Sequence, residues 1–153
     1  MPERMWLSLS NAFDQAWGIV KAGDCYQCAV NAMLSPNPDW VDPRLIHATV
    51  LGSKGGPLED QPYGHAYVAY QKPMGFPPDM LPDYYKGQQP MMEWVHDPMY
   101  ARDLGDKWED IPRALYERMY ARADENTMQS YDQDQMLELM MQNEHYGPWG
   151  ESQ

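Results

Sequence analysis

A cysteine at the predicted start of a helix is the first residue of this sequence that could carry out chemistry. Asp24 is a typical N-cap residue and Gln27 follows three positions later, so the spacing predicts a helix that opens at Cys25. The unpaired N–H groups and the dipole at a helix start stabilise an anion, so they favour the thiolate form of Cys25. The backbone N–H of Cys25 could also hold the oxyanion of a reacting carbonyl group. Cys25 is therefore a candidate nucleophile, whereas Cys28, one turn later, fits a small core residue.

A histidine and a carboxylate at the ends of predicted strands are the candidate partners of this thiol. His65 opens a strand over residues 65–70, and Asp97 ends a strand over residues 91–97. If these strands pair, the Asp97 carboxylate can reach the His65 ring, fix its tautomer and stabilise its charged form. His96, directly before Asp97, is an alternative histidine. The sequence thus predicts a triad in which His65 is the general base and Asp97 orients it.

Three short motifs follow one another in the order of these residues. They are Gly23-Asp24-Cys25-Tyr26, Gly64-His65-Ala66-Tyr67-Val68 and Trp94-Val95-His96-Asp97-Pro98. Over residues 23–98 the chain resembles the transglutaminase-like branch of the papain-like cysteine hydrolase superfamily. The resemblance implies a helix packed on an antiparallel sheet, with Cys25 as nucleophile, His65 as general base and Asp97 as orienting acid. Short phage and bacterial proteins share this pattern, and some members of the superfamily have lost catalysis and act as binding or scaffold domains.

Metal binding and redox chemistry are the competing uses of the two cysteines. The Cys25-x-x-Cys28 pair provides half of a zinc knuckle, but the sequence has no second cysteine pair and no closely spaced pair of histidines. A zinc site could still be assembled in space from Cys25, Cys28, His47 and His65. A redox motif of the thioredoxin type would follow a strand, whereas a helix is predicted before Cys25. We expect no metal and no cofactor.

The elements that must position these residues alternate in type along the chain. Helical periodicity predicts helices over 7–22 and 25–34, and β-branched or aromatic runs predict strands over 45–51, 65–70 and 91–97. A glycine-rich turn at 52–57 and a proline-rich loop at 71–90 separate the strands. Two further helices are predicted, one over 109–122 with an apolar face of Ile111, Ala114, Leu115 and Met119, and one after a capping pair of Ser130 and Gln133.

The fold class expected from this order is α+β, with N-terminal helices packed on a small antiparallel sheet and two C-terminal helices after it. The chain of 153 residues suits one domain, predicted over 1–146, with a flexible tail over 147–153. No apolar run is long enough to span a bilayer, and the first residues do not resemble a signal peptide. We therefore expect a cytoplasmic protein that does not bind membranes, located in the host cytoplasm if it is phage-encoded; the sequence does not indicate an oligomeric state.

Charge suggests a second function for the same fold. The net charge is −12, from 11 basic and 23 acidic residues, and a polyanion repels nucleic acid. Acidic side chains are concentrated in the C-terminal third, where they could form a docking surface. They are Asp103, Asp106, Glu109, Asp110, Asp124, Glu125, Asp132, Asp134 and Glu138.

The sequence therefore supports two hypotheses. In the first, the protein is a thiol-dependent hydrolase or acyl transferase, and Cys25 attacks an amide or isopeptide carbonyl of a protein or peptide substrate. In the second, it is a catalytically inactive acidic binding module, or a phage-encoded inhibitor, that docks a basic protein partner.

Overall fold

The structure is a computed structural model, and it describes residues 22–98 and 110–149. The helix predicted over 7–22 lies outside this part of the chain, apart from its last residue. None of the described helices is both long and apolar enough to cross a membrane.

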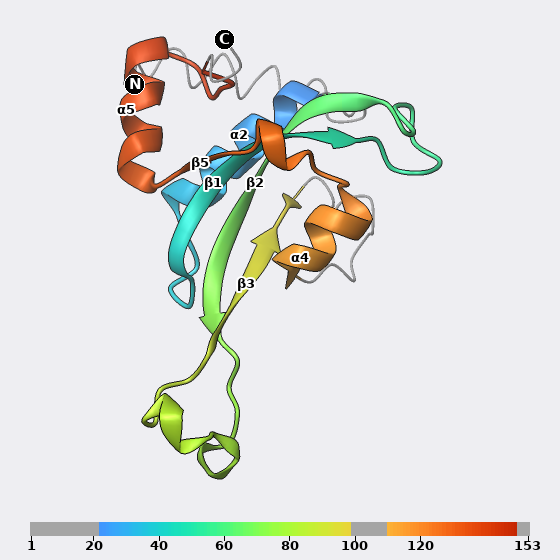
Figure 1. The fold of residues 1–153 in the computed structure, drawn as a ribbon. Coiled ribbons are helices and arrows are strands. Elements are labelled where there is room, and N and C mark those ends of the chain that lie inside the picture. The colour runs from blue at the N-terminus through green and yellow to red at the C-terminus, as the bar shows by residue number, and fades with distance from the viewer. Residues whose placement is uncertain (1–21, 99–109, 150–153) are drawn as a thin grey trace.

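Five antiparallel strands form one sheet, which confirms the predicted α+β class (Figure 1). The strands are β1 (Val41–Leu51), β2 (Pro62–Pro73), β3 (Met91–His96), β4 (Ile111–Pro112) and β5 (Gln129–Tyr131), and their order in the sheet is β4-β3-β2-β1-β5. The first three lie where the sequence predicted strands. The prediction of helices alone after residue 109 was wrong, because β4 and β5 come from that region and pair with β3 and β1.

The main helices are α2 (Ala22–Leu34) before the sheet and α5 (Gln133–Asn143) near the C-terminus. The predicted capping pair of α5 was also wrong. Ser130 lies in β5 opposite Ile46, and the helix is capped two residues later. The Asp132 carboxylate accepts from the backbone N–H of Gln135 at 2.8 Å, and the Gln135 side chain accepts from the backbone N–H of Asp132 at 2.9 Å.

The helical region predicted over 109–122 is shorter and wound differently. Three residues of α-helix, α4 (Arg113–Leu115), continue directly into a π-helix, η4 (Tyr116–Tyr120). The wider turns change which side chains face the sheet. Leu115 and Met119, two residues of the predicted apolar face, are 42% and 69% exposed, and Tyr116 is buried instead.

The two faces of the sheet carry separate cores, because successive side chains of β2 point to opposite sides. Ala66 and Val68 pack with α2 and α5 on one face, and Tyr67 and Ala69 pack with Tyr116 of η4 on the other. Residues 65–70 are therefore buried without a break. This explains why the strand reads as a continuous apolar run.

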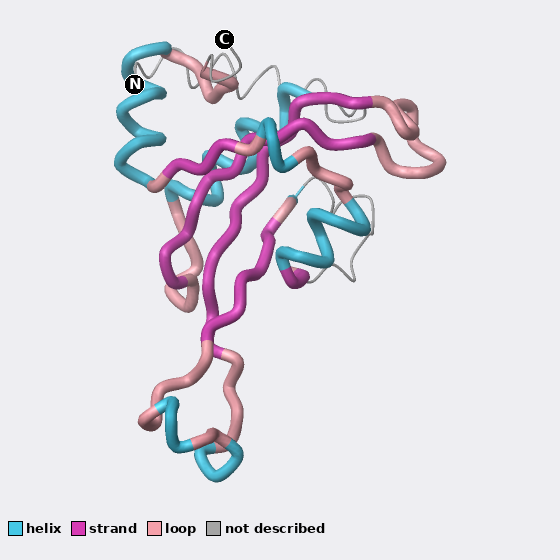
Figure 2. Tube along the Cα trace, in the orientation of Figure 1, coloured by secondary structure: helices cyan, strands magenta, loops and turns pink. Residues whose placement is uncertain are grey.

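The connection between β2 and β3 extends away from the rest of the molecule (Figures 1 and 2). Residues 74–90 contain two short 3-10 helices, η1 (Pro78–Met80) and η2 (Asp83–Tyr85), in the region predicted as a proline-rich loop. At the other end of the chain, Tyr146 is buried and Trp149 packs against the α2 core. The tail predicted from residue 147 is thus packed as far as Trp149, and residues 150–153 lie outside the described part.

Candidate active site

A histidine and a carboxylate meet at the ends of neighbouring strands. His65 lies near the start of β2, and Asp97 directly follows β3, which pairs antiparallel with β2. The Nε2 atom of His65 is 2.7 Å from Oδ2 of Asp97, and both side chains are buried. The predicted pairing of these strands is confirmed, and it brings the two groups into hydrogen-bonding contact.

Cys25 reaches the same histidine from helix α2. The His65 and Cys25 side chains share a hydrogen bond. Because Nε2 of His65 faces Asp97, the other ring nitrogen, Nδ1, is the one left for the sulfur. Cys25 is only 2% exposed, so the three predicted side chains form one buried cluster. This is the order of groups that a nucleophile, a base and an orienting acid require.

The environment of His65 favours its charged form. Burial by itself lowers the pKa of the ring, but the negative charges of Asp97 and Cys25, and hydrogen bonds with both, raise it. Together these effects hold the pKa of His65 well above its usual value. A proton taken from the thiol can therefore be kept on the imidazole.

The position of Cys25 in the helix differs from the prediction. Helix α2 already includes Ala22 and Asp24, so Asp24 is not its N-cap and Cys25 is the fourth described residue of the helix. The capping signal misplaced the start because Ala22 and Gly23 continue the helix ahead of it. The backbone N–H of Cys25 thus lies inside the helix, at the end of the first described turn, rather than at an open helix end.

The contact between Cys25 and His65 lies beside an edge of β2 that does not pair with β3. The core packing places Cys25 on the α2 face of the sheet, whereas strand alternation puts His65 on the same face as Tyr67. The pairing of β2 with β3 ends at Val68, three residues from His65. No described strand pairs with that edge of β2 at His65, so a side chain from the helix can meet the ring there.

A tyrosine that the sequence did not indicate completes the cluster. The Tyr116 hydroxyl donates a hydrogen bond to Oδ2 of Asp97, the oxygen that also contacts His65. Burial, with the charge of Asp97 and this hydrogen bond, raises the pKa of Tyr116 well above its usual value. Tyr116 was missed because the π-helix that turns it inward has no simple sequence periodicity.

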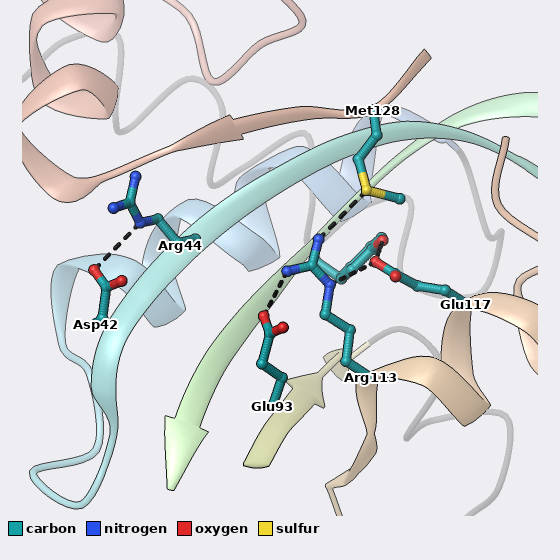
Figure 3. Close-up of polar contacts among 7 residues, drawn as sticks. Asp42, Arg44, Glu93, Arg113, Glu117 and Met128 are labelled. Carbon is teal, nitrogen blue, oxygen red and sulfur yellow. Dashed lines mark hydrogen bonds and ion pairs between the residues drawn. The ribbon is translucent and has the colours of Figure 1, made fainter. Parts of the chain in front are cut away.

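An arginine fixes the segment that carries Tyr116 (Figure 3). The Arg113 guanidinium bonds Glu93 of β3 at 2.8 Å and Glu117 of η4 at 2.9 Å, and it donates to the Met128 sulfur at 3.4 Å. Glu117 also accepts from the hydroxyl of Tyr67. This network ties η4 to two strands, so it supports the position of Tyr116 beside Asp97.

Close packing also joins the residues next to Cys25 and His65. A Cβ atom added at Gly64, directly before His65, would lie 2.6 Å from the hydroxyl oxygen of Tyr26, directly after Cys25. The Tyr26 ring meets the ring of His47 edge-on, with centroids 4.8 Å apart, and His47 also contacts Trp149 at 5.1 Å. The C-terminal segment therefore packs behind the helix that carries the thiol.

The other candidates take different positions. His96, the alternative histidine, points away from Asp97 and contacts Asp110 through Nδ1 at 2.9 Å. Among the described residues no group of three or more histidine, cysteine or acidic side chains could hold a metal ion, so the possible zinc site of Cys25, Cys28, His47 and His65 is not assembled.

Several of the acidic side chains proposed as a docking surface have internal roles. Asp110 bonds His96 and Tyr70, Asp124 accepts from the backbone N–H of Asn126, and Asp132 caps α5. Asp103, Asp106 and Glu109 lie outside the described residues.

A comparison of the chain with protein-family models, curated proteins and solved structures found no match.

Proposed function

We propose that the protein is a thiol-dependent hydrolase or acyl transferase that acts on an amide or isopeptide bond in a protein or peptide. The observation that carries the proposal is the position of His65, which contacts the Asp97 carboxylate at 2.7 Å on one side and the Cys25 thiol on the other. The order Cys25, His65, Asp97 and the helix packed on an antiparallel sheet also support a transglutaminase-like or papain-like core.

The reaction follows from the roles of these groups. His65 takes the proton of the Cys25 thiol, and the thiolate sulfur forms a bond to the substrate carbonyl carbon. The resulting oxyanion collapses, the carbon–nitrogen bond breaks, and His65 gives its proton to the leaving amine. A water molecule or a second amine, deprotonated by His65, then attacks the thioester, and the sulfur leaves and recovers the proton. Hydrolysis yields a carboxylic acid, and acyl transfer yields a new amide.

Asp97 makes and breaks no covalent bond in this reaction. Its carboxylate holds the His65 ring in the orientation that presents Nδ1 to the sulfur, and it stabilises the imidazolium that forms twice per turnover. Since all three groups are buried, little water competes for their hydrogen bonds.

Thiol labelling as a function of pH tests the proposal. In a Cys28→Ala background, Cys25 should react with iodoacetamide well below the pH of about 8.5 at which a free thiol ionises. Asp97→Asn removes the charge that stabilises the His65 imidazolium, so labelling at pH near 6 should slow by roughly tenfold or more. His65→Ala should move the midpoint of the labelling profile back to that of an ordinary thiol.

The midpoint of the profile, rather than the absolute rate, is the readout, because the buried sulfur reacts only when the reagent reaches it. Asp83→Asn is a matched control that also removes one carboxylate, from the exposed loop between β2 and β3 and away from His65, and it should leave the midpoint unchanged. A wild-type midpoint equal to that of a model thiol, or one that ignores His65→Ala, would overturn the proposed function.

A further inference from the structure

A cleft lies on the α2 face of the sheet, separate from the buried triad. Its floor consists of alternate residues of two paired strands, which point to one side: Tyr70 and Lys72 of β2, and Trp94 and His96 of β3. Trp40 and Asp110 form its walls. The volume is about 780 Å³, which is in the range of ligand-binding clefts. We call these six residues the Trp94 cleft.

A chain of hydrogen bonds fixes the side chains on one side of the cleft. The Tyr70 hydroxyl donates to Asp110, and the other oxygen of Asp110 contacts Nδ1 of His96 at 2.9 Å. The Trp40 and Tyr70 rings also stack, with centroids 4.7 Å apart and planes 16° apart. A site whose groups are held in place before binding loses less entropy when a ligand arrives.

The other side of the cleft offers groups that can meet a ligand, although the side-chain oxygen of Asn37 already accepts from the backbone N–H of Asp39 at 2.9 Å. The half-buried Trp94 ring has no ring contact and no hydrogen bond with any residue in the described part of the chain. His96 engages Asp110 through Nδ1, so its Nε2 remains available to a ligand. Asn37, Asp39 and Lys72 add an amide, a carboxylate and an ammonium group at the rim.

This combination distinguishes between ligand classes. A cation would suit an aromatic ring beside carboxylates, but Lys72 would repel it, and Asp110 is already bonded to His96 and Tyr70. An anion would meet Asp39 and the net charge of −12. A neutral ring with apolar C–H faces and hydroxyl groups at its edge can stack on Trp94 and exchange hydrogen bonds with all of the polar groups.

We infer that the Trp94 cleft binds a neutral sugar unit, with the sugar ring on the Trp94 indole and its hydroxyls on Asn37, Asp39, Lys72 and Nε2 of His96. The inference does not rest on the thiol chemistry of Cys25. It therefore holds or fails independently of the proposed function.

NMR titration of the indole N–H signals tests it directly, because the chain has six tryptophans. The ¹⁵N-labelled full-length Cys25→Ala protein is titrated with three neutral sugars, cellotriose, maltotriose and triacetylchitotriose, so that no turnover can complicate binding. At least one sugar should shift the Trp94 and Trp40 signals and leave the Trp149 signal in place. Trp94→Ala should weaken that affinity by roughly tenfold or more, and Trp94→Phe should recover part of it.

Controls keep the inference open to refutation. Tyr84→Ala removes an aromatic ring that is 76% exposed on the projecting loop, and it should not change the affinity. Asp39→Asn keeps a hydrogen-bonding side chain and should weaken binding less than Asp39→Ala. The inference is overturned if no sugar shifts the Trp94 signal at millimolar concentration, if folded Trp94→Ala binds like its parent, or if trilysine occupies the cleft and the sugars do not.

Discussion

One oxygen atom organises the triad at the scale of single residues. Oδ2 of Asp97 accepts from the Tyr116 hydroxyl and also contacts Nε2 of His65. The negative charge that stabilises the His65 imidazolium is therefore shared with a second donor. Tyr116 thus controls how much of the Asp97 charge acts on His65.

Tyr116→Phe tests this role. The substitution leaves the ring in place but removes one donor from a buried carboxylate, so it should lower the free energy of unfolding by about 1–3 kcal/mol. Because the Asp97 oxygen that contacts His65 then loses a competing donor, the pKa of His65 should rise further. NMR titration of the His65 ring protons measures the shift, and urea unfolding measures the loss. A lowered stability with an unchanged His65 titration would mean that Tyr116 is only a packing residue.

Single residues could be predicted where strand pairing sets their position, and not where an irregular helix or a choice between two cap residues does. The side chains of Cys25, His65 and Asp97 lie together as the sequence predicted, because strand pairing alone brings the second and third into reach; their catalytic roles remain predictions. Tyr116 could not be predicted, since its direction depends on a π-helix. The cap of α5 was displaced by two residues because Ser130 and Asp132 are both typical cap residues with glutamine three positions later.

At the scale of elements, the seating of helix α2 on strand β2 positions the thiol. The absence of a side chain at Gly64 lets the Tyr26 hydroxyl approach the strand next to His65. Gly64→Ala should push the helix away, which would destabilise the fold and shift the Cys25 labelling profile towards that of an ordinary thiol. Adding Tyr26→Phe removes the atom that the new Cβ would meet, so the double variant should recover much of both losses.

A double-mutant cycle of these two changes, followed by urea unfolding and thiol labelling, measures the coupling. Additive effects would show that the close approach of Gly64 and Tyr26 does not determine the position of the helix.

The start of α5 gives a second prediction for an element. Asp132→Ala removes the side chain that accepts from the backbone N–H of Gln135, and it should cost about 0.5–2 kcal/mol of unfolding free energy. Ser130→Ala is the matched control in β5, and it should cost clearly less. Thermal or urea unfolding of the two variants compares them, and a larger loss for Ser130→Ala would place the helix start where the sequence first indicated it.

Strand lengths explain why some elements were predictable and others were not. β1, β2 and β3 are long enough to show β-branched and aromatic enrichment. β4 has two residues and β5 has three, so their strand conformation comes from pairing with β3 and β1 rather than from their own composition. A short strand of this kind leaves no pattern that a single sequence can show.

At the scale of the whole molecule, three tyrosine–carboxylate pairs, one buried and two half-buried, join parts of the chain that lie apart in sequence. Tyr67 donates to Glu117, Tyr70 to Asp110, and Tyr116 to Asp97. Burial and the neighbouring negative charges raise the pKa of all three tyrosines above the usual value of about 10.

This arrangement predicts a loss of stability in alkali. A raised pKa means that the folded protein holds its proton more tightly than the unfolded chain does, so the stabilisation is complete below pH of about 10 and decreases above it. Urea unfolding at increasing pH should show this decrease, and the difference between wild type and Tyr116→Phe should shrink over the same range. A difference that stays constant up to pH of about 11 would contradict the linkage.

Strand β2 also sets the distance between the triad and the Trp94 cleft. His65 lies near its first residue and the floor of the Trp94 cleft near its last, and the backbone between them pairs with β1 throughout and with β3 from Val68 onward. Tyr70 lies five positions after His65, which at roughly 3.3 Å per residue sets a span of about 17 Å. Cys25 contacts His65 from the α2 face, on which the cleft also lies, so a molecule that contacts both the thiol and the cleft must span roughly this distance.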